Sequence, residues 1–110
     1  MFGDQSTTLI KAASNYSHTK KVVLLQSNGD ATLDLSFQVS ILDQAYKLSG
    51  KELGNTFTVD RNHGATALDS ASINFYWLNN DTLQIDYDKK LRTFIQEKNI
   101  DGITIVYTAR

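Results

Sequence analysis

The 110-residue chain contains no cysteine and no proline, and its charges nearly cancel. The absence of cysteine excludes disulfides, zinc–thiolate centres and a cysteine nucleophile. A net charge of −1 offers no basic surface of the kind that nucleic-acid binding requires. No apolar run approaches the roughly 20 residues that a membrane-spanning helix needs, and the N-terminal residues lack the apolar stretch of a secretory signal. We therefore expect no nucleic-acid partner and no transmembrane segment.

Two regions of the chain differ in composition. Residues 1–19 are mostly polar, and we expect a tether or a poorly ordered segment with at most one short strand or helical turn. From Lys20 onward, apolar and polar residues alternate with the period of a β-strand. Because 41% of the residues are hydrophobic, there is enough apolar material for one core. We expect residues 20–110 to form a single β domain.

The first predicted hairpin joins the strand that begins at Lys20 to the alternating segment 33–41. Asn28-Gly29 between them is typical of a two-residue type I′ turn, because both residues tolerate positive φ angles. That turn pairs apolar residues of the two strands, Leu24 with Leu33 and Val22 with Leu35. The matching of apolar faces supports this register.

A second predicted hairpin covers residues 73–87. A three-residue loop at 79–81, in which asparagine takes the left-handed conformation, pairs the apolar residues Ile73 with Tyr87, Phe75 with Ile85 and Trp77 with Leu83. Further strands are expected in "NTFTVD" and "GITIVYT". The segment 89–98 favours a strand that forms a last hairpin with residues 103–107, although one short helix there is the alternative. The fold class is therefore all-β, a small antiparallel β-sandwich or barrel-like roll of about six or seven strands.

The stretch "DRNHGATALDSAS" lacks strand periodicity, and long loops of this kind often carry function. In a hydrolase, His63 would act as the base, and Asp60 or Asp69 would orient it. No nucleophile-elbow motif accompanies these residues, so we expect no catalytic residue and keep a small hydrolase as the alternative. Asp60 is more simply the end of a strand, with a side chain that caps the following turn.

The same stretch begins like a calcium-binding loop. It departs from that pattern at Gly64, Ala65 and Ala71, where the loop needs Asp or Asn, Gly and Glu. Only two histidines exist, and His18 is far from His63 in the sequence, which disfavours zinc. We expect no metal site and no cofactor.

Tyr76 and Asn74 are the candidate binding residues of the second hairpin. They project from the face opposite Phe75 and Trp77, where they would form part of a shallow recognition surface. The simpler interpretation is a cross-strand packing pair or the inner face of a second sheet. Arg61 in the preceding loop is a further candidate.

Several strand and turn segments resemble those of a known group of domains. "GNTFTVD", "DTLQIDYD", "RTFIQE" and "GITIVY", preceded by "NGDAT" and "FQVSI", are similar to segments of small domains without an assigned function in exported or lipoprotein-like bacterial proteins of the Bacteroidota kind. The resemblance runs from about Lys20 to the end. It implies a periplasmic, outer-membrane-anchored or secreted setting, with the polar N-terminus as a tether after a removed signal, and it supplies no catalytic residue or cofactor.

These observations lead to three hypotheses about function. The first is a non-catalytic interaction or structural β module of a bacterial envelope or secreted protein, whose partner is a protein or a glycan. The second is the small hydrolase that uses the His63 loop. The third is a cytoplasmic binding protein of the immunity or inhibitor type.

Overall fold

The computed structural model describes residues 7–27, 36–49, 54–60 and 71–110, and its regular structure consists of β-strands. In chain order, the described strands are β1 (Thr7–Ser14), β2 (Lys20–Ser27), β3 (Ser36–Asp43), β4 (Phe57–Asp60), β5 (Ile73–Asn79), β6 (Thr82–Tyr87), β7 (Arg92–Gln96), β8 (Asn99–Ile100) and β9 (Ile103–Ala109). The described ranges contain no helix that is long and apolar enough to cross a membrane.

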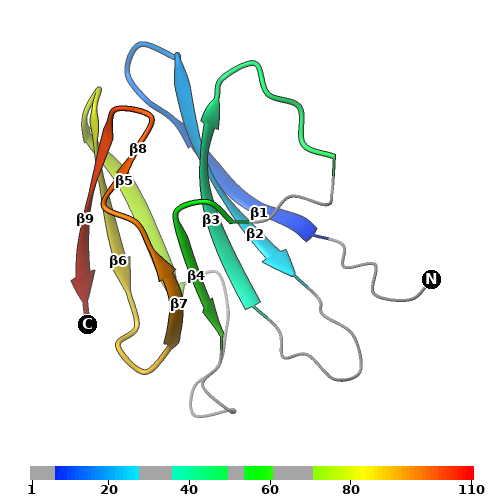
Figure 1. Cartoon of the computed structure of the whole chain (residues 1–110), viewed down its shortest axis with the longest axis vertical. Helices are drawn as coiled ribbons and strands as arrows, with labels where there is room; N and C mark the ends of the chain where they lie inside the picture. Colours follow the sequence, from blue (N-terminus) through cyan, green and yellow to red (C-terminus); the bar gives the residue numbers. More distant parts are fainter. Residues whose placement is uncertain (1–6, 28–35, 50–53, 61–70) are drawn as a thin grey trace.

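The strands form two sheets that face each other (Figure 1). The larger sheet has the order β1-β2-β3-β4-β7, and the smaller has the order β5-β6-β9-β8. This confirms the predicted all-β fold. All neighbouring strands are antiparallel except β6 and β9, which run parallel. Strands β1 and β8 are additional to the six or seven that the sequence predicted.

The register of β2 on β3 corrects the first predicted hairpin. Leu24 pairs with Val39, and Val22 pairs with Ile41, so each is displaced by six residues from its expected partner. The predicted turn at 28–29 lies outside the described residues. Because six is an even number, the displacement keeps the apolar residues on one face. It also places Lys20 opposite Asp43, where the two side chains form an ion pair of 2.5 Å.

The β5–β6 hairpin has the register that the sequence predicted. Trp77 pairs with Leu83, and the other two expected pairs also form. The connection is one residue longer than a regular ladder accommodates, and a β-bulge between Trp77 and Asn79 takes up the extra residue, so that Asn79 pairs with Thr82. The described non-glycine residues with positive φ are His18 and Asp101. The expectation of a left-handed asparagine in this loop was therefore wrong, because the bulge accommodates the extra residue.

The segment 89–98 contains strand β7 rather than a helix, as favoured, but its partner differs from the prediction. β7 pairs with β4 in the larger sheet, and the hairpin with β9 is made by the two residues of β8. Asp101 and Gly102, with φ of 49° and 80°, form the two-residue turn of that hairpin. Positive φ at both positions matches a type I′ turn, which Asp-Gly favours.

Residues 7–14 form a strand of eight residues, where the sequence suggested a tether with at most one short strand. β1 pairs along the edge of β2, with a bulge between Leu9 and Lys11. Ile10 and Ala13 pack against the core. None of the eight residues is fully buried, as expected for a strand at the edge of a sheet.

The hydrophobic core lies between the sheets and draws on both. The buried core residues are Val22, Leu24, Phe37, Val39, Ile41, Phe57, Val59, Ile73, Trp77, Leu83, Ile85, Leu91, Ile103 and Ile105. β2 is buried on both faces, because Val23 and Leu25 on its reverse face are each only 1% exposed. Gly54 packs tightly onto the same face of the sheet, and a Cβ there would lie 2.8 Å from Gln38 Cβ.

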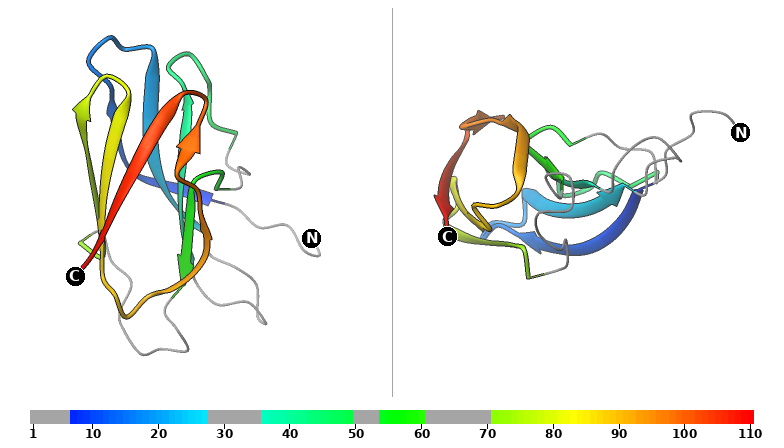
Figure 2. Two further views of the ribbon diagram at one scale, coloured as in Figure 1. Left: turned by 60° about the vertical axis from the view of Figure 1, so that its left-hand side comes forward. Right: turned by 90° about the horizontal axis from the view of Figure 1, so that it is seen from below.

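The two sheets curve around the core without closing into a barrel (Figure 2). Side chains rather than a strand ladder connect β1 to β5, and we call this boundary the β1–β5 seam. There Trp77 Nε1 donates to Ala13 O at 3.1 Å, and Tyr16 Oη donates to Trp77 O at 2.9 Å. Away from the β1–β5 seam, the Tyr107 hydroxyl of β9 donates to Glu97 O at 2.5 Å. The Tyr107 ring packs on Phe57, with ring centroids 5.2 Å apart.

Candidate binding face

The outer face of the smaller sheet carries the candidate site. Alternation along β5 places Ile73, Phe75 and Trp77 toward the core, so the intervening side chains point outward. The strand registers then align the outward residues of β5, β6 and β9 in rows across the sheet. We define the outer face by the residues of these rows, Asn74, Tyr76, Gln84, Asp86, Val106 and Thr108, together with Leu78, the exposed residue at the β-bulge after Trp77.

The first row combines an aromatic ring, an amide and an aliphatic side chain. Tyr76 lies opposite Gln84, and Gln84 lies beside Val106 on the other neighbouring strand. Tyr76 and Val106 are 48% and 40% exposed, and Leu78, two positions along β5, is 49% exposed. Gln84 between them is buried. The exposed apolar side chains therefore gather on one surface of the sheet, which is typical of an interaction site.

The second row is polar. Asn74 lies opposite Asp86, and Asp86 lies beside Thr108. Gln84 Nε2 donates to Asp86 Oδ1 at 2.8 Å and to Thr108 Oγ1 at 2.9 Å. These two bonds fix the amide and orient the carboxylate before any ligand arrives. The row presents oxygen acceptors next to the apolar side chains of the first row.

Lys11 of β1 reaches the far end of the polar row across the β1–β5 seam. Its Nζ donates to Asn74 Oδ1 at 3.1 Å and lies 5.5 Å from the centroid of the Phe75 ring. Burial lowers the pKa of Lys11 from its ordinary value, because desolvation disfavours the ammonium form. The lysine thereby helps to hold β5, the outermost strand of the candidate face, against the larger sheet.

Asn15 anchors the end of the molecule at which the β1–β2 and β5–β6 turns meet. Its Oδ1 accepts from the backbone N–H groups of Thr19 and Lys20, and its Nδ2 donates to Thr19 Oγ1 and to Asn80 O. Ser17 N donates to Asn80 Oδ1 at 2.8 Å. The turn that carries Tyr16 is thus hydrogen-bonded to the β5–β6 turn, which fixes the position of the end of β5 in the outer face.

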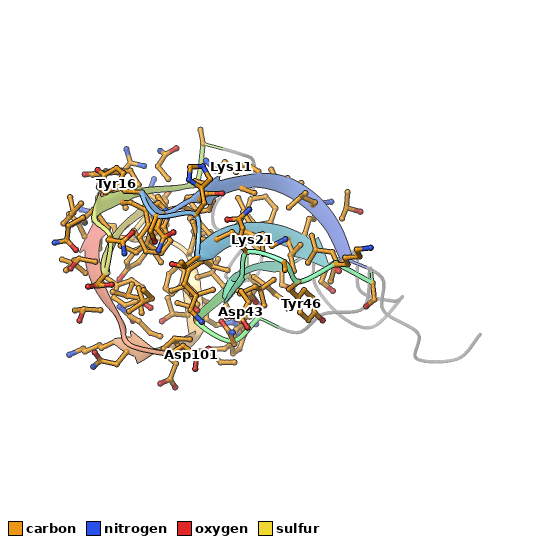
Figure 3. All side chains as sticks on the ribbon, turned by 90° about the horizontal axis from the view of Figure 1, so that it is seen from above. Lys11, Tyr16, Lys21, Asp43, Tyr46 and Asp101 are labelled. Atoms are coloured by element: carbon orange, nitrogen blue, oxygen red, sulfur yellow. The ribbon has the colours of Figure 1, made fainter. Side chains whose placement is uncertain are left out.

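Figure 3 shows how polar side chains are distributed at this end. Lys11 and Tyr16 lie on the side where β1 meets β5, and Asp43 and Asp101 lie on the other side. Lys20 Nζ lies 2.5 Å from Asp43 and 3.6 Å from Asp101, and these carboxylates raise the pKa of Lys20. These ion pairs link the larger sheet to the β8–β9 turn, which gives the carboxylates a structural role.

Of the predicted binding residues, Tyr76 and Asn74 share the outer face, as expected from their spacing. Arg61, His63 and Asp69 lie outside the described residues. Asp60 ends β4, as predicted.

The Asp60 side chain is 5% exposed. It accepts hydrogen bonds from Arg92 Nε at 3.2 Å and from Nη2 at 2.5 Å. This bidentate pair joins β4 to β7. The carboxylate is therefore engaged in a cross-strand contact within the larger sheet.

Sequence reasoning did not assign Gln84, Asp86, Val106 or Thr108 to the site. The hairpin register predicted from the sequence already implied that Asp86 lies opposite Asn74. Val106 and Thr108 carry no such signal, because their position depends on the parallel pairing of β6 with β9. No group of three potential metal-ligating residues exists within the part of the chain that the structure describes.

Comparison with known proteins leaves the fold and the site as the basis for assigning a function. The chain matches no protein-family model, and no curated protein and no solved structure matches it significantly.

Proposed function

We propose that this chain is a non-catalytic binding module that recognises a protein partner through the outer face of β5, β6 and β9. The resemblance of its strand and turn segments to exported bacterial domains favours a setting in the cell envelope or outside the cell. The alternative setting is the cytoplasm, where a binding protein of the immunity or inhibitor type would use the same face.

The observation that carries the proposal is the grouping of Tyr76, Leu78 and Val106 beside an organised polar row. Protein interfaces commonly combine apolar contacts at the centre with hydrogen-bonding groups around them, and aromatic residues are enriched there. A tyrosine also contributes a large contact area at a small cost in conformational entropy, because few torsions are fixed on binding.

A protein partner explains the face better than a glycan. Sugar rings stack on aromatic rings, and Tyr76 is the one aromatic residue of the outer face. Leu78 and Val106 add aliphatic surface that a polyhydroxylated ligand cannot use, whereas apolar side chains of a protein bury it favourably. We therefore treat a glycan as an outcome of the tests below.

The experiment is site-specific photo-crosslinking in the cells that produce the protein. A benzophenone amino acid replaces Tyr76, Leu78 or Val106 in separate variants, and Leu9 in the control. Leu9 is 48% exposed and belongs to β1 of the larger sheet, so it matches the exposure but not the location. We expect one reproducible protein adduct from the three outer-face positions and none from position 9.

A second variant, Tyr76→Ser with Val106→Ser, tests whether the face itself is required. With the probe at Leu78, this double variant should lose the adduct while its far-ultraviolet circular dichroism remains that of the unmodified protein. Equal adducts from all positions, or none from the outer face, would refute the proposed function.

A further inference from the structure

We infer that the corner of the outer face formed by Tyr76 and Asp86 captures an arginine side chain of the partner. This inference rests on the proposed function and names the chemical group that the face selects. The guanidinium would stack on the Tyr76 ring and pair with the free oxygen of Asp86.

The register brings the ring and the carboxylate together. Tyr76 is directly opposite Gln84, and Asp86 follows Gln84 by two residues on the same face of β6. The two side chains are therefore diagonal neighbours across antiparallel strands, which are separated by about 7–8 Å and within reach of long or aromatic side chains. A planar group lying on the ring can extend toward the carboxylate from this position.

The Asp86 carboxylate is oriented but not neutralised. Its Oδ1 accepts from Gln84 Nε2 at 2.8 Å, and Thr108 Oγ1 holds the same amide from the other side. Within the described part of the chain, Asp86 forms no ion pair, and its Oδ2 accepts no hydrogen bond. Gln84 acts here as a positioning residue, because it fixes the direction in which the second oxygen points.

The charge of the outer face itself is negative, which favours a cationic ligand. Asp86 is the one charged residue among those that define the outer face. Lys11 approaches the polar row from β1, but Asn74 separates it from Asp86, and its ammonium is engaged with Asn74 Oδ1 at 3.1 Å. The carboxylate is thus available to a cation that arrives from above the sheet.

Arginine fits this corner better than lysine does. Its guanidinium is planar, stacks on aromatic faces and is more weakly hydrated than an ammonium, so that it makes the ring contact and the carboxylate contact together. Val106, which is 40% exposed and lies in the same row as Tyr76, can then contact the aliphatic stem of the arginine.

The test is a nuclear magnetic resonance titration of the full chain with Nα-acetyl-arginine amide. Nα-acetyl-citrulline amide, which has the same shape without the charge, serves as the matched probe. We expect the arginine probe to shift the backbone signals of Tyr76, Gln84, Asp86 and Thr108 with a millimolar dissociation constant, and the citrulline probe to shift them little. Because exposed cation–π contacts and surface ion pairs are weak, Asp86→Asn and Tyr76→Leu should each weaken binding about threefold to fivefold.

Two variants serve as controls. Tyr76→Phe retains the ring and should bind the arginine probe as the unmodified protein does. Asp81→Asn makes the same change of charge in the β5–β6 turn of the same sheet, and it should leave the affinity unchanged. Equal binding of the citrulline probe, or equal effects of Asp81→Asn and Asp86→Asn, would overturn the inference.

The outcomes separate this inference from the proposed function. If the arginine probe shifts no signal while adducts still form at position 76, the partner is recognised by other groups and only the arginine site is rejected. If chitotriose shifts the outer-face signals and the arginine probe does not, the face binds a glycan and both statements fail. If the arginine probe binds as expected but no protein adduct forms, the arginine site stands without the proposed protein partner.

Discussion

Replacing Asn15 by alanine should destabilise the protein more than any comparable substitution of an exposed asparagine. The side chain is 1% exposed and uses its full hydrogen-bonding capacity, two acceptor and two donor interactions. Its four hydrogen bonds measure 3.0–3.1 Å. Asn15→Ala leaves the backbone N–H groups of Thr19 and Lys20 and the carbonyl oxygen of Asn80 without these partners.

The magnitude follows from the number of bonds. A typical intramolecular hydrogen bond contributes about 1 kcal/mol net, so four bonds give a central value of about 4 kcal/mol. Water that enters the space can satisfy part of the exposed backbone, which reduces the expected loss to about 3 kcal/mol. For a domain of this size, about 4 °C per kcal/mol applies, so the melting temperature should fall by about 12 °C.

Urea unfolding monitored by fluorescence measures this loss directly. Trp77 is the single tryptophan, and its indole N–H bonds to Ala13 O at the same end of the molecule. The matched control is Asn80→Ala, which removes one exposed side-chain bond to Ser17 N and retains the backbone oxygen that Asn15 contacts. We expect the control to lose less than about 1 kcal/mol. A loss of similar size in both variants would refute the reasoning that burial and the number of bonds decide the cost.

Further predictions concern two glycines and one tyrosine. Gly54→Ala should destabilise the protein by about 1–3 kcal/mol in urea unfolding, because overpacking is costly and the new Cβ would lie 2.8 Å from Gln38 Cβ. At Gly102 a new Cβ would meet no atom within 4 Å, but φ is +80°, so Gly102→Ala should lower the free energy of unfolding by about 1 kcal/mol. Gly102→Asn should recover most of that loss, because asparagine tolerates positive φ. An equal cost at both glycines for alanine and asparagine would contradict this distinction. Burial, reinforced by the charge of Glu97, raises the pKa of Tyr107, so the folded protein keeps a proton that the unfolded chain loses near pH 10. Stability should therefore fall as the pH rises above about 10, and alkaline unfolding of Tyr107→Phe should show a shallower fall; the same slope in both proteins would exclude this residue as the cause.

Alternation along the sequence was sufficient to predict the fold class but not every register. Leu24 meets an apolar partner either with Leu33, as predicted, or with Val39, as observed. Face matching distinguishes even displacements from odd ones, and it does not choose among the even ones. The β5–β6 hairpin was predicted correctly because its connection is short, which leaves few alternative pairings for Trp77 and Leu83.

Alternation also predicted the part of the candidate face that lies on β5. Tyr76 and Asn74 share a face because they are two residues apart on one strand. Val106 and Thr108 join them only through the parallel pairing of β6 and β9, which connects segments with β7 and β8 between them. Local sequence patterns carry no information about the pairing of β6 with β9. That pairing requires β7 to pair with β4 in the other sheet instead of with β9, as the sequence had predicted.

The position of β9 has a consequence for the order of events during synthesis. β9 (Ile103–Ala109) lies between β6 and β8 in the smaller sheet, yet it is the last of the described strands to emerge from the ribosome. Until β9 has been made, one edge of β6 is unpaired, and the smaller sheet cannot contribute Ile103 and Ile105 to the core. Completion of this sheet must therefore follow translation of residue 109. Any machinery that acts on unfolded chains can therefore engage the exposed edge of β6 until residue 109 has been made.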